Sequence, residues 1–373
     1  MYKIGYLGNF EKVPQVVEYI LNSDVENLEK ELKSGWDINK KITLSEFITE
    51  TPLEIAIQCI KEEVILWLIE KGVNVKADVD DWGTPISSAA RFLSSEMCEL
   101  FIKHGALENL TKKQYKRIYT DIYYGKNFKN IDVFEKYGVT VKKYGNNCLR
   151  EAVYDRNQKL AQMFLDYGAD INYHEYDQVF TDNSTPVIVA ATTDSLKLVK
   201  WLVEKGADIT IKNRFGERPY SIAVLNKNQE MIDYIKSLEP VDFHNEEARK
   251  SIIKKYKLPK DMVEFFNKGD LKIEFSENID SKYIEFWKLE DTVEMTWKRK
   301  KYLSLVKDLE NYWLHLLWYP KEKTLYIFDG EHEEIFKIGD WSYFINNCEE
   351  IVGKFLDCLV YNKIPRSCNI NFQ

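Results

Sequence analysis

The sequence predicts an all-α solenoid of about seven helix pairs over residues 1–239, followed by an α+β domain with an antiparallel sheet over residues 240–373. One observation behind this prediction is a glycine that recurs at a spacing of about 33 residues. A fixed period of this size marks supersecondary units that stack, because no single unit can bury its own apolar face. The other observation is a change after Pro240, where the period ends and five of the nine tryptophans follow.

The first helix of each predicted pair begins at a threonine followed by a proline. Thr51 can cap a helix by accepting from free amides of the first turn, and Pro52 suits the first helical position because its missing N–H costs nothing there. Two further copies keep this dipeptide and a fourth has lost the threonine: Thr84-Pro85, Thr185-Pro186 and Arg218-Pro219. The second helix ends at the recurrent glycine, which adopts the left-handed conformation without penalty. These glycines are Gly72, Gly105, Gly138, Gly168 and Gly206.

These residues resemble the ankyrin repeat, whose consensus has Thr-Pro-Leu-His at the first helix and Leu-Leu-x-x-Gly-Ala-Asp at the end of the second. The best copies of the second motif are Leu165–Ile171 and Val203–Ile209, and the most divergent copy is Tyr115–Gly138. The resemblance implies helix pairs over roughly residues 10–239 and an extended surface for binding proteins. An insertion, His174–Ser184, lengthens one loop, which is either part of the binding side or a tolerated surface loop.

Aromatic and charged residues at the predicted loop tips are candidate partner contacts, since exposed Trp, Tyr and Arg are the usual anchors of interfaces. They are Trp36, Asp37, Asp80, Asp81, Trp82, Tyr173, Glu175, Tyr176, Asp177, Arg214 and Phe215. An alternative stays open for each of them. In particular, Trp82 and Phe215 would then pack against the neighbouring repeat and not against a partner.

The residues after Pro240 alternate between helix-like and strand-like stretches. A helix, a Leu-Pro break at Leu258 and a short helix ending at Gly269 come first. Strands then follow, with turns at Pro320–Lys323 and Asp329-Gly330. The expected strands are Leu271–Phe275, Ile284–Leu289, Trp313–Pro320, Thr324–Asp329 and Glu333–Asp340. One final helix is expected from Trp341 to Val360.

Three segments of this region resemble the SUKH superfamily. They are Leu258–Phe266, Phe286–Asp291, and the hairpin Tyr326–Ile338 followed by Trp341–Ile345. The resemblance implies an immunity protein, which binds and neutralises a bacterial toxin, and many such toxins are nucleases. An acidic cluster in this region would then mimic the negative charge that a basic nuclease expects: Asp329, Glu331, Glu333, Glu334 and Asp340. A charged hairpin that only interacts with solvent is the alternative.

Composition excludes several function classes. The 52 basic and 60 acidic residues give a net charge of −8, which disfavours nucleic acid as a partner and favours a basic protein. Six cysteines without a CxxC pair or a matching histidine predict no metal site and reduced thiols. A charged N-terminus without a signal peptide and the lack of an apolar run of about 20 residues predict a cytoplasmic protein with no membrane partner.

The sequence contains no arrangement of residues that indicates catalysis. The five histidines are isolated, and glycine-rich phosphate loops and nucleophile motifs are missing. We therefore expect no catalytic residues and no cofactor. The predicted function is stoichiometric inhibition of a cognate toxin, and the alternatives are a general scaffold or, less favoured, an enzyme that uses Glu333 and Glu334. The oligomeric state stays open.

Overall fold

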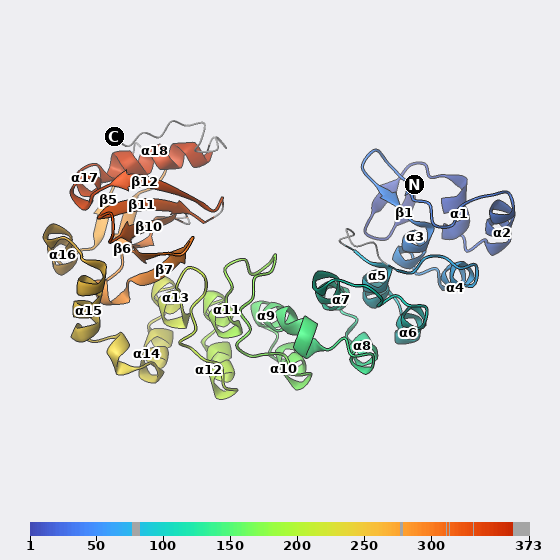
Figure 1. Ribbon diagram of the computed structural model, residues 1–373, viewed down its shortest axis with the longest axis horizontal. Helices are drawn as coiled ribbons and strands as arrows, with labels where there is room; N and C mark the ends of the chain where they lie inside the picture. The colour runs from blue at the N-terminus through green and yellow to red at the C-terminus, as the bar shows by residue number, and fades with distance from the viewer. Residues whose placement is uncertain (77–82, 277–278, 311, 313, 331, 361–373) are drawn as a thin grey trace. The chain divides into compact units, whose positions relative to one another are not determined.

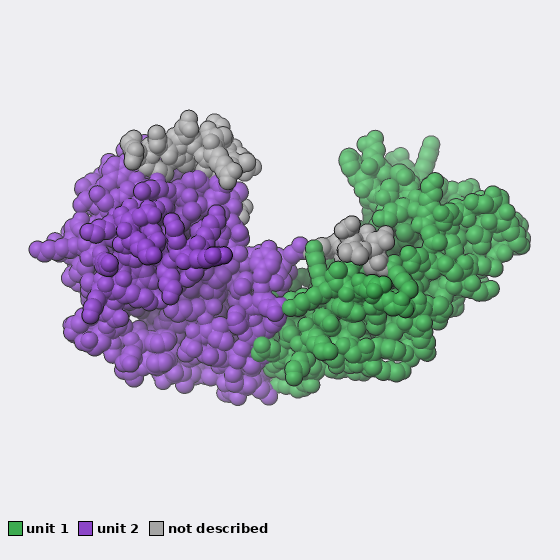
Figure 2. Space-filling view, in the orientation of Figure 1, with its two compact units in different colours: residues 1–170 green, residues 171–373 purple. Residues whose placement is uncertain are grey.

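The computed structural model describes residues 1–76, 83–276, 279–310, 312, 314–330 and 332–360 (Figure 1). The chain forms two compact units, residues 1–170 and residues 171–373 (Figure 2). The boundary between the units differs from the predicted domain boundary at 239–240, because the last repeats pack together with the sheet that follows them. The last helix pair ends at Leu238.

The first unit begins with a short hairpin and continues with helix pairs. The hairpin strands are β1 (Tyr2–Ile4) and β2 (Gly8–Phe10), and a second hairpin has β3 (Ile42–Thr43) and β4 (Thr49–Glu50). The pairs over the described residues are α1 (Gln15–Leu21) with α2 (Val25–Lys33), α3 (Pro52–Gln58) with α4 (Glu62–Glu70), α5 (Pro85–Phe92) with α6 (Ser95–Lys103), α7 (Lys112–Gly125) with α8 (Ile131–Lys136), and α9 (Asn146–Tyr154) with α10 (Gln158–Asp166). The short η1 (Phe128–Asn130) lies between α7 and α8, and η2 (Val141–Gly145) directly precedes α9.

The predicted helix caps are confirmed. Thr51 Oγ1 accepts from Glu54 N at 3.1 Å, and Thr185 Oγ1 accepts from Ile188 N at 3.3 Å. Thr84 forms a full capping box with Ser87, in which each side chain bonds to the other residue's backbone N–H. These caps satisfy amides that have no partner inside the helix, so the sequence fixes where each first helix begins.

The second unit contains two further helix pairs, two antiparallel sheets and a helical end. The pairs are α11 (Pro186–Thr192) with α12 (Leu196–Glu204) and α13 (Pro219–Leu225) with α14 (Gln229–Leu238); η3 (Val241–Phe243), α15 (Glu246–Tyr256) and α16 (Lys260–Asn267) follow. One sheet has the order β5-β6-β9, formed by Lys272–Glu274, Tyr283–Phe286 and Val306–Asp308. The larger sheet has the order β12-β11-β10-β8-β7, with β7 Val293–Trp297, β8 Lys300–Ser304, β10 Leu314–Tyr319, β11 Thr324–Asp329 and β12 Glu334–Gly339. The remaining elements are η4 (Leu289–Asp291), α17 (Trp341–Asn346) and α18 (Cys348–Val360).

Three features of this unit differ from the expectation. Strands β7, β8 and β9 were not anticipated from the sequence. The expected single helix after Trp341 is two helices, because the chain leaves helical geometry at Asn347, where φ is −126°. The expected strand at Trp313 begins at Leu314, and Trp313 itself lies outside the described residues.

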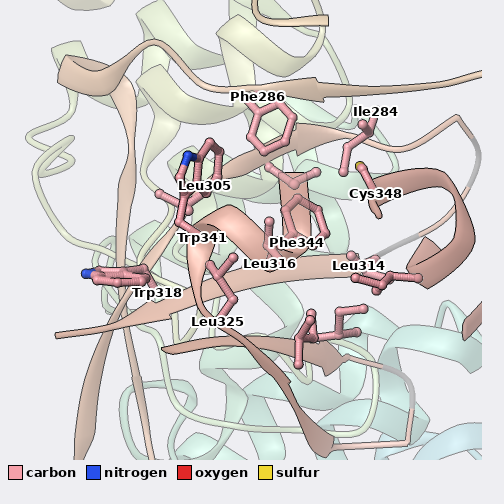
Figure 3. Close-up of a cluster of buried hydrophobic side chains, with 14 of the residues drawn as sticks. Ile284, Phe286, Leu305, Leu314, Leu316, Trp318, Leu325, Trp341, Phe344 and Cys348 are labelled. Atoms are coloured by element: carbon pink, nitrogen blue, oxygen red, sulfur yellow. The ribbon is translucent and has the colours of Figure 1, made fainter. Parts of the chain in front are cut away.

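The larger sheet is buried on both faces. Alternate residues of β10 point to opposite faces, so Leu314, Leu316 and Trp318 join one core with α17 and α18 (Figure 3). Leu317 and Tyr319 join a second cluster on the other face, where Tyr302 and Phe328 also lie. Within the part of the chain that the structure describes, α17 and α18 contribute to the first core and not to the second cluster, so another segment covers the second face.

Candidate protein-binding surface

The loop before α13 supplies that cover. Phe215 is 1% exposed and belongs to the cluster on the second face of the sheet. Its ring centroid lies 5.3 Å from that of His315 and 6.1 Å from that of Phe328. The expectation of an exposed contact at Phe215 is therefore corrected, and so is the alternative that it packs on the next repeat. The physical reason is that this aromatic sheet face would otherwise be an exposed apolar patch.

Arg214 takes part in the same contact between the loop and the sheet. Its Nη2 lies 2.6 Å from Glu333 Oε1, and its Cζ lies 4.9 Å from the centre of the Phe215 ring. Gly216 follows with φ of +85°, close to the backbone oxygen of Glu294 on β7. An added Cβ would clash there, so only glycine lets the loop approach the strand.

The predicted acidic cluster on the hairpin is partly engaged within the chain. Asp329 is 3% exposed and accepts from both the backbone N and the Nδ1 of His332, at 3.2 and 2.7 Å. Glu333 pairs with Arg214, and Glu334 is partly buried at the start of β12. Glu331 lies outside the described residues. Of the expected acidic contacts, Asp329 is thus buried and not available at the surface.

The inserted loop has its own internal support. Tyr173 is 7% exposed, and its hydroxyl donates to Glu175 Oε2 at 3.3 Å. Asp177 Oδ1 accepts from the backbone N–H groups of Val179 (2.9 Å) and Phe180 (2.7 Å). Tyr176 is 57% exposed. Among these predicted contacts, Tyr176 therefore has the most ring surface to offer a partner.

The predicted contacts in the first unit lie on turns. Trp36 is partly exposed, and Asp37 is exposed but uses Oδ1 to accept from Asn39 N at 2.8 Å. Asn39 in turn accepts from Asn74 N of the next repeat at 2.7 Å. Asp37 therefore shapes the turn that links two repeats. The other predicted contacts of this unit, Asp80, Asp81 and Trp82, lie outside the described residues.

A different surface of the first unit carries exposed aromatic rings. It begins at Tyr6, which is 71% exposed at the tip of the β1–β2 hairpin. The Tyr6 ring lies 4.4 Å from Arg91 Cζ and 5.5 Å from the ring of Phe92, both near the end of α5. Gly5 lets the hairpin approach α3, since a Cβ there would lie 2.6 Å from Gln58 O. The hairpin thus holds an aromatic ring against a guanidinium group.

Arg91 is fixed from its other side by α7. Its Nη1 lies 3.3 Å from Asp121 Oδ1, and Arg117 Nε lies 2.7 Å from Asp121 Oδ2. Asp121 is 3% exposed, so these charge-assisted contacts are little screened by solvent. Helices α5 and α7 can pack closely because Gly125 has no Cβ. A Cβ at this position would lie 2.5 Å from Arg91 O.

Two further tyrosines continue this surface onto α9. Tyr124 is 47% exposed and Tyr154 is 55% exposed. The Tyr124 hydroxyl donates to Glu151 Oε1 at 3.0 Å, and Glu151 precedes Tyr154 by three residues on the same helix face. We name the set Tyr6, Arg91, Phe92, Tyr124 and Tyr154 the inner-helix surface, because four of its members lie on the first helices of their pairs.

The sequence analysis did not predict the inner-helix surface, because it considered aromatic and charged residues at the loop tips and not those on the first helices. One signal was available: Tyr124 and Tyr154 stand at the ends of first helices, away from the apolar stripe. Rigid aromatic rings beside an arginine are what protein interfaces use as anchors. The inner-helix surface therefore has the kinds of side chain that protein interfaces use.

Several buried ionisable groups were also candidates for chemistry. Burial lowers the pKa of His315 to about 4, and its Nδ1 lies 3.3 Å from Ser304 Oγ. Burial raises the pKa of Glu54 to about 7.

Among the residues that the structure describes, no three His, Cys, Asp or Glu side chains gather as metal ligands. Over the same residues, no helix has the length and apolar character needed to cross a bilayer.

Comparison with known proteins identifies the repeats. A family model described as ankyrin repeats, in three copies, matches residues 152–245. A protein of fowlpox virus (strain NVSL), named for its ankyrin repeats, is 28% identical over 181 residues, which are 47% of this chain and 43% of the viral protein. This chain thus spans less than half the length of that relative. The crystal structure of the ankyrin repeat domain of Bcl-3, described as a unique member of the IkappaB protein family, is similar over 61% of this chain and 100% of its own, with a TM-score of 0.46 and 17% identity.

The class of this protein follows from these findings. Residues 152–245 match ankyrin repeats, and a part rich in antiparallel sheet follows them. Ankyrin repeats point to a protein–protein interaction scaffold, and such domains typically bind partners without catalysing reactions.

Proposed function

We propose that this chain binds another protein through its inner-helix surface. The observation that carries the proposal is that Tyr6, Tyr124 and Tyr154 are exposed, while Tyr6 packs against Arg91 and Tyr124 is hydrogen-bonded to Glu151. Restrained rings lose little conformational entropy on binding, and a tyrosine offers both apolar area and a hydrogen bond. The three rings therefore suit the centre of an interface.

The more specific proposal is that the partner is a toxin domain, which this protein neutralises by covering it. The support is the resemblance of residues 258–345 to SUKH immunity proteins, together with the binding role of ankyrin repeats. A basic toxin is favoured because the chain carries a net charge of −8, which speeds encounter with a positive partner. The proposed compartment is the cytoplasm, where the thiols stay reduced.

Co-expression with the toxin domain encoded by the adjacent gene tests both proposals. The wild-type protein should rescue growth, and the variant Tyr6→Ala/Tyr124→Ala/Tyr154→Ala should not. Loss of the three rings should weaken binding by about 2 kcal/mol or more, which is about thirtyfold in Kd by calorimetry. A matched control is Phe47→Ala/Leu66→Ala, which removes exposed apolar side chains of the same unit outside the surface.

The outcomes separate the two levels of the proposal. If the wild-type protein fails to rescue growth, the toxin role is abandoned. If the triple tyrosine variant rescues growth and binds as tightly as the wild type, the inner-helix surface is abandoned. Circular dichroism melting of each variant checks that the fold is retained.

The main alternative is an adaptor that joins several clients. An adaptor should bind several proteins, each more weakly, and no single adjacent toxin should depend on it. A parallel calorimetric titration with the purified toxin domain distinguishes an inhibitor from an adaptor. An inhibitor should saturate at one molecule of this protein per molecule of toxin domain.

A further inference from the structure

One end of the larger sheet carries a dense group of positive side chains. Two turns lie at this end: residues 298 and 299 join β7 to β8, and residues 320–323 join β10 to β11. Because β8 and β10 are antiparallel neighbours, the start of β8 lies beside the end of β10 and the two turns are adjacent. We name this group the basic sheet end, and its members are Lys298, Arg299, Lys300, Lys301, Lys321, Lys323 and Lys337.

Most of these positive charges are not neutralised within the described part of the chain. All seven side chains are exposed. The carboxylate of Glu322 lies among them and pairs with Lys300 at 3.7 Å and with Lys337 at 3.6 Å. The remaining five cations form no ion pair with a described residue: Lys298, Arg299, Lys301, Lys321 and Lys323.

Two further carboxylates near this end leave the positive excess in place. Asp340 follows β12, and its Oδ1 accepts from Tyr343 N at 2.8 Å as the cap of α17. Glu333 pairs with Arg214, whose Cζ lies 6.0 Å from the centre of the Trp297 ring. Asp340 therefore offsets at most one of the five remaining positive charges.

The net charge of −8 belongs to the whole chain and not to this end of the sheet. Exposed charges are largely screened from one another beyond about 8 Å at physiological ionic strength. A ligand at the two turns thus experiences the cations beside it more strongly than carboxylates elsewhere on the protein. The basic sheet end is therefore a local site for an anionic partner.

The side chains around the two turns indicate which anionic partner fits. The neighbouring rings of Tyr302, Tyr319 and Tyr326 are only 2%, 7% and 9% exposed. The Trp297 ring packs on Phe328, with 4.8 Å between the ring centroids. A protein interface needs exposed anchors at its centre, and a single strand stacks its bases on exposed rings, so neither suits this end.

Two other classes of anionic surface remain. Stable membrane attachment takes a second signal beside a basic patch, and no large apolar side chain is exposed among the described residues of the two turns. The phosphate backbone of a nucleic-acid duplex, in contrast, is bound by lysine and arginine charges alone.

We propose that the basic sheet end binds the phosphate backbone of a nucleic-acid duplex without reading its bases. The turn with Lys298 and Arg299 and the turn with Lys321 and Lys323 supply the contacts. Paired strands hold the two turns next to each other, so the cations are gathered before the duplex arrives. The inference is independent of the toxin proposal, which rests on the inner-helix surface of the first unit.

Fluorescence anisotropy of the full chain with a labelled DNA duplex of about 20 base pairs, between about 50 and 200 mM NaCl, tests the proposal. The basic-end variant is Lys298→Asn/Lys321→Gln/Lys323→Asn. Asparagine is used at Lys298 and Lys323 because it tolerates their positive φ of 44° and 51°. The variant should raise Kd about tenfold or more at the lowest salt and reduce the slope of log Kd against log [NaCl] by about 3, since each lost phosphate contact removes about 0.9.

Two further variants separate local charge from other effects. The matched control, Lys197→Gln/Lys205→Gln/Lys236→Gln, removes the same charge from exposed lysines outside the basic sheet end and should change Kd less than about twofold. The variant Lys298→Arg/Lys321→Arg/Lys323→Arg keeps the charge and should bind the duplex as the wild type does. A duplex of unrelated sequence should bind equally well, because the backbone is the same. Circular dichroism melting checks that each variant is folded.

Four results would overturn the proposal. The first is an equal Kd and salt slope for the basic-end variant and the control variant. The second is tighter binding of a single strand than of the duplex. The third is displacement of the duplex by polyglutamate at an equal concentration of charge, which would assign the basic sheet end to an acidic protein. The fourth is tighter binding to vesicles of phosphatidylcholine and phosphatidylserine in equal amounts, which would assign it to a membrane. The toxin domain is not used in this test, so its outcome is separate from that of the toxin proposal.

Discussion

Arg214 and Glu333, which are 119 residues apart in the chain, form an ion pair of 2.6 Å between the last repeats and the sheet. The pair lies beside Phe215, whose ring closes the second face of the sheet. End repeats of a solenoid need a cap, because their outer apolar face has no neighbouring repeat. In this protein the sheet-rich part is that cap, and the repeat loop in turn covers the sheet.

Phe215→Ala should destabilise the second unit by about 3 kcal/mol. The substitution removes a fully buried ring from an aromatic cluster and leaves a cavity. Phe47→Ala is the matched control, since Phe47 is 93% exposed and its loss should change stability by no more than about 0.5 kcal/mol. Urea unfolding and hydrogen exchange of β10 and β11 measure the effect. Equal unfolding midpoints for the two variants would contradict the assigned role of Phe215.

The two ion pairs near the last repeat should differ strongly in strength. Glu239 is buried and accepts from Arg218 Nε at 2.6 Å, so Glu239→Gln leaves a buried guanidinium without its counter-charge and should cost about 3 kcal/mol. Glu333 is about half exposed, so Glu333→Gln should cost less than about 1 kcal/mol. Thermal melts at low and high NaCl measure both, and only the Glu333→Gln effect should shrink clearly with salt. A larger loss from Glu333→Gln than from Glu239→Gln would refute this ranking.

Gly216→Ala should be far more destabilising than Gly206→Ala. Both glycines have positive φ, +85° and +97°, so both substitutions carry a backbone cost of about 1 kcal/mol. Gly206 has open space around the added methyl group, whereas Gly216 faces Glu294 O. The clash should add about 1–3 kcal/mol or release the loop from the sheet. Urea unfolding compares the variants, and similar costs would show that the loop approaches β7 less closely than we find.

Glu54→Gln should stabilise the protein at alkaline pH and not at acid pH. Burial raises the pKa of Glu54 to about 7 from its ordinary 4.5, and Ser88 Oγ donates to its carboxylate at 2.6 Å. Between pH 4.5 and about pH 7, Glu54 has lost its proton in the unfolded chain but keeps it in the folded protein. The free energy of unfolding therefore falls as pH rises through this window. The variant should therefore gain up to about 3 kcal/mol over the wild type at pH 8 and nothing at pH 4. An equal change at both pH values, measured by urea unfolding, would count against the raised pKa.

The sequence determined much of the repeat architecture. Threonine, proline and glycine act through their own backbone and the next few residues, so their spacing located the helix starts and ends correctly. Strands β10, β11 and β12 also followed from their alternation. Strands β7 and β8 did not, because their two-residue turn uses Lys298 and Arg299 at positive φ of 44° and 65°, without the Asn-Gly signal typical of such turns.

The candidate surfaces were decided by tertiary structure. Phe215 is an aromatic residue at a predicted loop tip, which is typical of an exposed anchor. Its burial depends on a sheet about one hundred residues further along the chain. A hairpin places Tyr6 over Arg91, a residue from another helix pair, and the Tyr6 side chain remains exposed there. Burial and ion pairing depend on contacts between segments that are distant in sequence, whereas helix caps and turns depend on neighbouring residues. The sequence by itself therefore determined which elements form, and only the folded chain decided which of their side chains remain available to a partner.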